Sequence, residues 1–216
     1  MRACATRRTT AWAVALMTVA VASTGNGQQP YRNPAPSVFE GAAREAWQKP
    51  ELVVRALELH PGMVVVDLGA GSGFFTRRFA EAVGPTGKAI GLDVDPDMVA
   101  YMTADARERK LSNYEARLVK PDDAGLAPNT VDLIFLCDTY HLIGDRVAYF
   151  RRLKAALKPD RGRLVVVDFQ PAAFPGSTHV MNPQVPQDEL REAGYRLIKT
   201  DDFLPRQFFF VFVPAG

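Results

Sequence analysis

The sequence predicts an α/β fold built on a doubly wound, mostly parallel sheet. Apolar runs that suit buried strands alternate along the chain with segments of helical periodicity, which is typical of right-handed crossovers between parallel strands. The first apolar run, residues 63–66, has no polar alternation and therefore suits a strand covered on both faces. A glycine-rich turn at 67–73 follows it directly, and ligands of such sheets bind beyond the carboxyl ends of the strands.

Composition indicates one globular domain of ordinary size. The chain has 216 residues, of which 47% are hydrophobic and 23% charged, enough for a substantial core. Basic residues are spread among acidic ones and no zinc-ligand or RNA-binding signature occurs, so we expect neither a metal ion nor nucleic acid as a partner. Of the two cysteines, Cys4 lies in an N-terminal leader and Cys137 in an apolar run, so no intrachain disulfide is expected.

Residues 1–22 differ in character from the rest and predict a secretory signal peptide. Three arginines precede an uncharged stretch over 11–22, which is short for a bilayer span of about 20 residues and ends in small residues that suit a cleavage site. We therefore expect a linker over 23–36, a folded domain over 37–216 and export, most simply to a bacterial periplasm. An uncleaved membrane anchor and a cytoplasmic protein with a mis-chosen start codon remain the alternatives.

Helices are predicted on both sides of the first strand. One is expected over 38–48 and a second over 51–59, where a proline occupies a helix-compatible position and apolar residues fall on one side. After the glycine turn, Phe75, Phe79 and Val83 recur at four-residue spacing, which predicts an amphipathic helix packed on the sheet.

The second strand is expected over 88–92, and Asp95 before a proline predicts a capped helix start. The remaining central elements follow the same alternation of apolar runs and helical periodicity. They are strands three to five over 115–119, 131–137 and 163–169, with a helix over 146–157.

The C-terminal residues predict a closing hairpin after a short helix over 186–193. The run 208–213 is apolar throughout and suits a strand buried on both faces, whereas 195–201 has polar positions that are tolerable at a sheet edge. The last strand is therefore expected to insert inside the sixth.

The spacing of Gly69, Gly71 and Gly73 narrows the class of ligand. A dinucleotide fingerprint needs Gly-x-Gly-x-x-Gly to seat a pyrophosphate, but Phe74 stands where the last glycine is required. Pyrophosphate binding, and with it a nicotinamide oxidoreductase, is disfavoured. Asp93 ends the second strand about 20 residues later, where an acid is expected to accept hydrogen bonds from ribose hydroxyls.

The combination of Asp67, the glycine turn and Asp93 resembles the class I S-adenosylmethionine-dependent methyltransferases, from about residue 53 to the C-terminus. The resemblance implies a Rossmann-like sheet of seven strands in the order 3-2-1-4-5-7-6, with strand 7 antiparallel. It also implies S-adenosylmethionine as cofactor and methyl transfer by direct displacement. The segment 157–168 is most similar to the small-molecule branch that contains the quinone-ring methyltransferases, so we expect a small-molecule acceptor.

The resemblance also assigns roles within the cofactor site. Asp67 is expected to organise the turn that receives the amino-acid end of the cofactor, and Asp93 to hold the ribose hydroxyls. An acid after strand three is implied near the adenine amino group; Asp122 and Asp123 both qualify, and the distance to Leu126 favours Asp122. The cofactor-binding residues expected are Asp67, Gly69, Ala70, Gly71, Gly73, Asp93, Val94, Asp122 and Asp138.

Residues after strand four are the candidates for contact with an acceptor. Asp138 and His141 can accept a proton if the nucleophile is an oxygen, a nitrogen or an acidic carbon, a task that suits histidine near neutral pH. The structural alternative is that Asp138 caps the following segment and His141 packs beneath the cofactor. The segment 171–186, which contains His179, is long enough to cover the site as a lid.

Two other functions remain open. An aminopropyl transferase that uses a decarboxylated cofactor has a related glycine motif, but it needs further acids around the acceptor amine. An exported, non-catalytic domain that binds an adenosyl ligand is the other, because the methyl donor is made in the cytoplasm.

Overall fold

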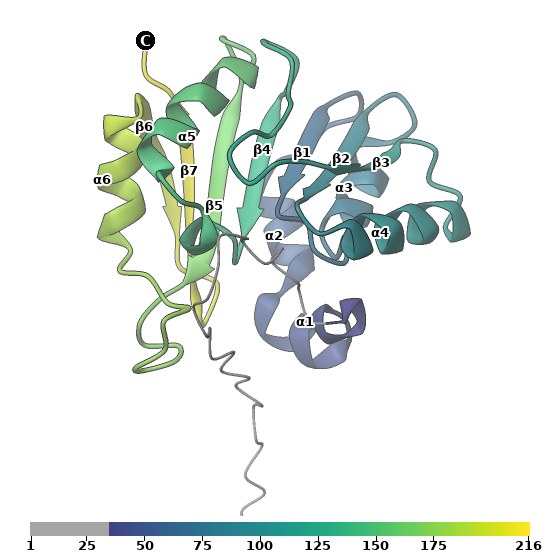
Figure 1. Cartoon of the computed structure of the whole chain (residues 1–216), viewed down its shortest axis with the longest axis horizontal. Coiled ribbons are helices and arrows are strands. Elements are labelled where there is room, and N and C mark those ends of the chain that lie inside the picture. The colour runs from purple at the N-terminus through teal and green to yellow at the C-terminus, as the bar shows by residue number, and fades with distance from the viewer. Residues whose placement is uncertain (1–34) are drawn as a thin grey trace, which may run out of the picture. The chain divides into compact units, whose positions relative to one another are not determined.

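Seven strands form one sheet in the order β3-β2-β1-β4-β5-β7-β6, and only β7 runs against the others (Figure 1). This is the order that the resemblance implied. The structure is a computed structural model and describes residues 35–216, so the predicted signal peptide and nearly all of the predicted linker lie outside the described residues. The strands are β1 (Val64–Leu68), β2 (Lys88–Asp93), β3 (Tyr114–Leu118), β4 (Leu133–Cys137), β5 (Arg163–Phe169), β6 (Tyr195–Asp201) and β7 (Gln207–Pro214).

Helices cover both faces of the sheet. Over one face lie α2 (Pro50–Ala56), α3 (Thr76–Val83) and α4 (Pro96–Glu108), and over the other α5 (Arg146–Leu153) and α6 (Gln184–Glu192). None of the helices between residues 35 and 216 combines the length and apolar character needed to cross a membrane. The remaining elements are α1 (Ala42–Gln48) and the short helices η1 (Pro36–Phe39), η2 (Tyr140–Leu142) and η3 (Lys154–Ala156).

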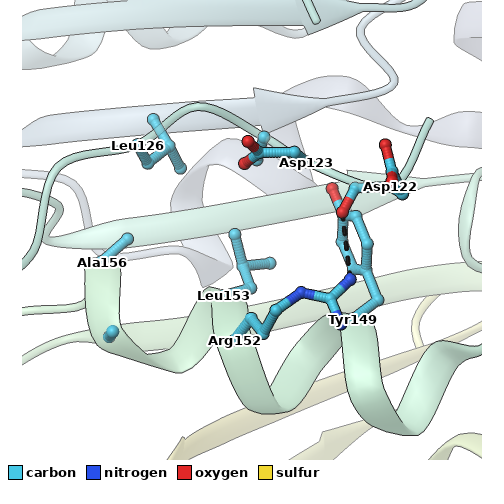
Figure 2. A pocket seen from close by; sticks show the side chains of 9 residues that line it. Asp122, Asp123, Leu126, Tyr149, Arg152, Leu153 and Ala156 are labelled. Carbon is cyan, nitrogen blue, oxygen red and sulfur yellow. Dashed lines mark hydrogen bonds between the residues drawn. The ribbon is translucent and has the colours of Figure 1, made fainter. Parts of the chain in front are cut away.

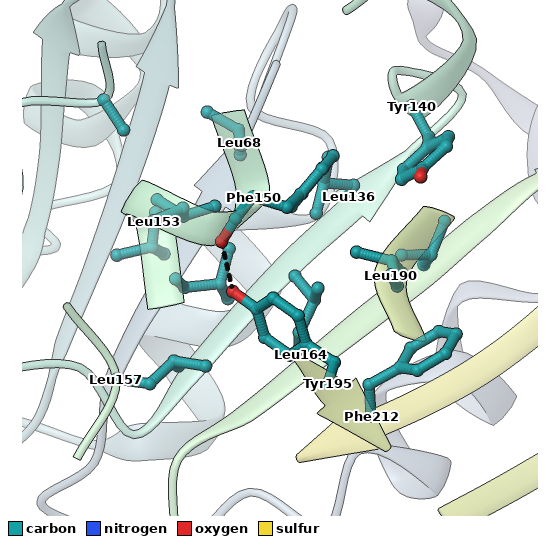
Figure 3. Packing of buried hydrophobic residues seen from close by; sticks show 14 of the residues in the cluster. Leu68, Leu136, Tyr140, Phe150, Leu153, Leu157, Leu164, Leu190, Tyr195 and Phe212 are labelled. Carbon is teal, nitrogen blue, oxygen red and sulfur yellow. Dashed lines mark hydrogen bonds between the residues drawn. The ribbon is translucent and has the colours of Figure 1, made fainter. Parts of the chain in front are cut away.

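Alternate residues of each central strand enter different cores, as expected for strands covered on both faces. Val65 packs under α2 and α3, whereas Val66 belongs to the cluster under α5 and α6. Figure 3 shows this second cluster, in which the hydroxyl of Tyr195 donates a hydrogen bond to the carbonyl of Phe150 over 3.0 Å. The apolar run of β7 is buried between β5 and β6, which confirms its predicted place inside the last hairpin.

The largest differences between the structure and the predicted elements are in three places. The helix expected over 38–48 is divided, because Gly41 has φ +101° and separates η1 from α1. The helix expected over 146–157 ends at Leu153 and continues as a tighter 3₁₀ turn. The connection over 119–132, between β3 and β4, contains no helix, so strands and helices do not alternate throughout.

Candidate functional site

The carboxyl ends of β1, β2, β4 and β5 meet at one edge of the sheet, because these strands are parallel. The glycine turn after β1 is joined to the end of β2 by backbone hydrogen bonds. The amides of Gly69 and Ala70 both donate to the carbonyl of Leu92, over 2.8 and 3.0 Å. Figure 1 shows α1 and the segment between β5 and α6 near this edge.

The three glycines of the turn have different reasons to be glycine. All have positive φ, of +74°, +56° and +77° for Gly69, Gly71 and Gly73, a conformation that side chains disfavour. A Cβ on Gly69 would overlap with Thr139, and one on Gly73 would overlap with the hydroxyl of Tyr114. A Cβ on Gly71 would meet nothing within 4 Å. Gly71 therefore presents bare main chain to open space, which fits a ligand that approaches the backbone closely.

Asp67 ties the end of β1 to the start of α3. Its Oδ2 accepts a 2.7 Å hydrogen bond from the hydroxyl of Thr76, and only 3% of the residue is exposed. Burial raises the pKa of Asp67 to about 7, although the hydrogen bond from Thr76 and the positive charge of Arg44 oppose the shift. Asp67 thus joins the end of β1 to α3, and its expected role at the amino-acid end of the cofactor stays a prediction.

Asp93 holds the glycine turn against β2. Its Oδ2 accepts from the amide of Gly71 over 2.8 Å, and its Oδ1 accepts from the amide of Asp95 over 3.0 Å. Burial raises its pKa, while these backbone hydrogen bonds act in the opposite direction. An ionised carboxylate has about four acceptor positions, so lone pairs remain for ribose hydroxyls. Val94 follows in the same turn, and Asp95 caps α4 as predicted, by accepting from the amide of Asp97.

Asp138 lies at the exit of β4 with a left-handed backbone conformation, φ +55°. Its Oδ1 accepts a 2.6 Å hydrogen bond from Nε2 of Gln207, whose Oε1 accepts in turn from Nε2 of Gln48 over 2.7 Å. Burial, together with the negative charge of Asp168, raises the pKa of Asp138 to about 7. The adjacent Thr139 donates to the carbonyl of Gly69 over 3.3 Å, so the β4 exit contacts the glycine turn.

His141 lies in η2, which is fixed in place by its neighbours. Tyr140 is fully buried, stacks on Phe150 and donates to a carboxylate oxygen of Glu189 over 2.8 Å. The imidazole Nδ1 of His141 lies 2.9 Å from Oδ1 of Asp168, at the end of β5. His179, from the segment predicted as a lid, meets the ring of His141 edge to face with centroids 5.6 Å apart.

The helix α1 contributes residues that sequence reasoning did not place at the site. The guanidinium carbon of Arg44 lies 4.2 Å from the ring centroid of Phe74, which follows the glycine turn. The charge of Arg44 lowers the pKa of both Asp67 and Asp138, against the effect of their burial. Gln48 and Gln207 are also buried. The only sequence signal for Gln207 is a polar residue beside an otherwise apolar run.

Asp122 and Asp123 lie apart from these residues, in a pocket of about 460 Å³ between the β3–β4 connection and α5 (Figure 2). Arg152 donates to the backbone carbonyl of Asp122 over 3.1 Å, and Asp123 accepts from the amide of Gly125. Both acids are exposed, and among the described contacts none joins either side chain to the glycine turn. The adenine contact of Asp122 therefore stays a prediction.

Comparison with known proteins identifies relatives over most of the domain. A family model described as a methyltransferase domain matches residues 59–198. An arsenite methyltransferase from Halobacterium salinarum is 31% identical over 116 residues, which is 53% of this chain and 29% of that protein. A ubiquinone/menaquinone biosynthesis C-methyltransferase from Shewanella frigidimarina is 28% identical over 124 residues, which is 57% of this chain and 48% of that protein.

A solved structure has the same architecture. The structure of a SAM-dependent methyltransferase from Aquifex aeolicus superposes with a TM-score of 0.76 at 26% identity, covering 82% of this chain and 95% of that chain. The chain spans less than half the length of the two curated relatives above. The family match nevertheless includes the glycine turn, Asp93 and the exits of β4 and β5. The chain belongs to the methyltransferase-domain family of class I S-adenosylmethionine-dependent methyltransferases, whose cofactor is S-adenosylmethionine.

Proposed function

We propose that this chain transfers a methyl group from S-adenosylmethionine to a small-molecule acceptor at the exit of β4. The observation that carries the proposal is the bare main chain of Gly71, which faces open space and is hydrogen-bonded to the carboxylate of Asp93. An adenosyl group can lie against this backbone while a carboxylate at the end of β2 accepts from its ribose hydroxyls.

The bound cofactor supplies an electrophilic methyl group on a sulfonium. The residues of the chain align the acceptor with that group and exclude water from the reaction. Asp67, Gly69 and Gly73 shape the turn. In this proposal Asp93 binds the ribose, and Asp138 and His141 contact the acceptor.

The position of the segment between β5 and α6 supports a quinone-like or other small acceptor. His179 from this segment contacts His141, so the segment can select what reaches the β4 exit. The names of both curated relatives also refer to small molecules, arsenite and quinones. We do not expect nucleic acid to be the acceptor, because the basic residues of the sequence are interspersed with acids.

Calorimetric titration with S-adenosylmethionine, its demethylated product S-adenosylhomocysteine and NAD tests the cofactor assignment. We expect both sulfur compounds to bind and NAD not to bind. Transfer of a radiolabelled methyl group to small molecules then tests catalysis. Failure of both sulfur compounds to bind at millimolar concentration contradicts the proposal, binding without any transfer favours a non-catalytic adenosyl-binding domain, and preference for decarboxylated S-adenosylmethionine favours aminopropyl transfer.

We propose in addition that the protein is exported after cleavage of residues 1–22. The support is the pattern of three arginines, a short uncharged stretch and small residues at its end. Fractionation of cells that express the full chain with a C-terminal tag, followed by N-terminal sequencing, measures both location and cleavage. A tagged chain that keeps its leader and stays in the cytoplasm contradicts export but leaves the proposed methyl transfer intact.

A further inference from the structure

The carboxylate of Asp168 contacts the imidazole of His141. Asp168 is fully buried at the end of β5, where its Oδ1 accepts from the amide of Phe169 over 2.8 Å and its Oδ2 from the amide of His141 over 3.2 Å. Nδ1 of His141 lies 2.9 and 3.1 Å from these two oxygens. The carboxylate therefore contacts both the backbone and the side chain of His141, and it holds the ring in one orientation.

This contact determines which nitrogen of His141 carries the proton. An ionised carboxylate only accepts hydrogen bonds, so Nδ1 of the neutral ring is the donor and Nε2 has a free lone pair. Nε2 forms no hydrogen bond with any residue in the described part of the chain, and 9% of the side chain of His141 is exposed. The basic nitrogen can therefore reach a ligand at the site edge.

His141 is also close to the cofactor turn. It follows Thr139 by two residues, and the hydroxyl of Thr139 contacts the carbonyl of Gly69. The charged or titratable groups that face His141 come from three elements: Asp168 from β5, Asp138 from the β4 exit and His179 from the β5–α6 segment.

We propose that Asp168 is a positioning residue that makes His141 the general base for an acceptor with an ionisable hydroxyl, a phenol or an enol. This inference rests on the proposed methyl transfer. The hydroxyl proton passes to Nε2 of His141 as an oxygen lone pair forms the bond to the methyl carbon. The bond between sulfur and that carbon breaks, and its electron pair stays on sulfur as a neutral thioether. Asp168 stabilises the imidazolium, which returns its proton to solvent after the product leaves.

The chemistry of the chain disfavours a soft acceptor such as arsenite. Arsenic(III) is a soft centre that thiolates bind best. The sequence has two cysteines, and Cys137 is the one in the described residues. Burial raises the pKa of Cys137 well above its usual value, so its thiolate is suppressed. A hydroxyl acceptor instead uses the base that the site provides.

Nitrogen NMR of the imidazole rings tests the orientation without any acceptor. The chain has three histidines, so each ring signal can be assigned by substitution. We expect neutral His141 to carry its proton on Nδ1, and Asp168→Asn to abolish this preference. His60→Gln, at an exposed position in the connection between α2 and β1, is the matched control and should leave the His141 signals unchanged. A proton on Nε2 of neutral His141 in the unsubstituted protein would overturn the inference.

Two phenols of different acidity test the chemistry. 4-Methylphenol keeps its proton near neutral pH, whereas 4-nitrophenol is largely ionised at pH 8 and needs no base. Asp168→Asn and His141→Ala should each lower kcat for 4-methylphenol by about 100-fold or more, and kcat for 4-nitrophenol by less than tenfold. The KM for S-adenosylmethionine should not change, and added imidazole should restore activity to His141→Ala but not to Asp168→Asn.

Equal losses for the two phenols, or transfer to amines or thiols and to neither phenol, would overturn the inference. If none of these probes is methylated, the proposed class of acceptor is wrong. If Asp168→Asn does not fold, the position of the proton on neutral His141 in the unsubstituted protein still tests the role of Asp168, and His141→Ala with its rescue by imidazole tests the base. Calorimetry with S-adenosylmethionine separates the two proposals. If the unsubstituted protein does not bind the cofactor, the proposed methyl transfer itself is wrong. If it binds the cofactor, a negative result concerns only the roles of Asp168 and His141.

Discussion

Asp93 accepts hydrogen bonds from the amides of Gly71 and Asp95, so it shapes the turn as well as facing the expected ribose. Asp93→Ala removes hydrogen bonding from the ribose to a charged group, worth about 1.5–3 kcal/mol in total. We therefore expect S-adenosylmethionine to bind about 10- to 150-fold more weakly, as measured by calorimetry. Asp93→Asn keeps one acceptor oxygen for the turn, and it should lose affinity with a smaller loss of thermal stability. Unchanged affinity in Asp93→Ala would refute the ribose assignment.

Asp138 makes stability depend on pH. Because burial raises its pKa from 3.8 to about 7, the folded state binds this proton more tightly than the unfolded state. Its stabilising contribution is complete below about pH 4 and is lost as the pH rises through about 7. Asparagine keeps an oxygen for Gln207 and carries no charge. Asp138→Asn should therefore raise the free energy of unfolding by about 1–3 kcal/mol at pH 8, and by less at pH 5.

Urea unfolding at the two pH values measures this difference. Asp160→Asn, at an exposed position before β5, is the matched control and should leave the pH dependence of the unsubstituted protein in place. If Asp138→Asn has the same pH dependence as the unsubstituted protein, the buried carboxyl of Asp138 does not titrate in this range.

At the scale of elements, two glycines of the same turn are expected to have different roles, Gly73 in folding and Gly71 in cofactor binding. Gly73→Ala would force a Cβ into Tyr114 and Met102, so we expect a loss of about 2 kcal/mol or more of stability. Gly71→Ala meets open space, and its cost in stability is the strained φ alone, about 1 kcal/mol. Its Cβ would occupy the side from which the cofactor approaches, so binding should weaken at least tenfold. Thermal unfolding and calorimetry on both variants compare the two effects, and equal cofactor affinity in Gly71→Ala and the unsubstituted protein would place the ligand elsewhere.

The elements that the sequence predicts correctly are those whose burial or capping can be inferred from neighbouring residues in the sequence. The apolar run in β7 requires a strand covered on both faces, and its place inside β6 follows from that requirement, whereas pairing with β5 was implied by the family resemblance. The start of α4 follows from the cap at Asp95. By contrast, the hydrogen bond between Gln48 and Gln207 joins residues 159 positions apart, and no local pattern reports such a contact.

The same distinction applies to the site. Asp67, the glycines and Asp93 form a sequence motif because they lie in two adjacent strand exits, and the structure brings them together. Arg44 reaches Phe74 only because α1 docks near the turn, a tertiary effect that helix periodicity does not specify. Asp168 looks in the sequence like the end of an apolar strand, and its role depends on η2 lying beside it.

At the scale of the whole molecule, cofactor binding is linked to unfolding, because the site combines segments from β1, β2 and β4 that come together only in the folded domain. A ligand that binds only the folded state at 100 times its Kd stabilises that state by about 2.7 kcal/mol. For a domain of about 180 residues, this corresponds to a rise in Tm of roughly 5–11 °C.

S-Adenosylmethionine and S-adenosylhomocysteine should both produce this rise in differential scanning calorimetry, and NAD at the same concentration should produce none. Asp93→Ala serves as the control for site specificity. At the concentration that saturates the unsubstituted protein, its weaker affinity should reduce the rise in Tm to a few degrees or less, because the stabilisation falls with the logarithm of the ratio of ligand concentration to Kd. An equal rise in Asp93→Ala and in the unsubstituted protein would mean that the cofactor stabilises the domain from a site other than the exits of β1 and β2.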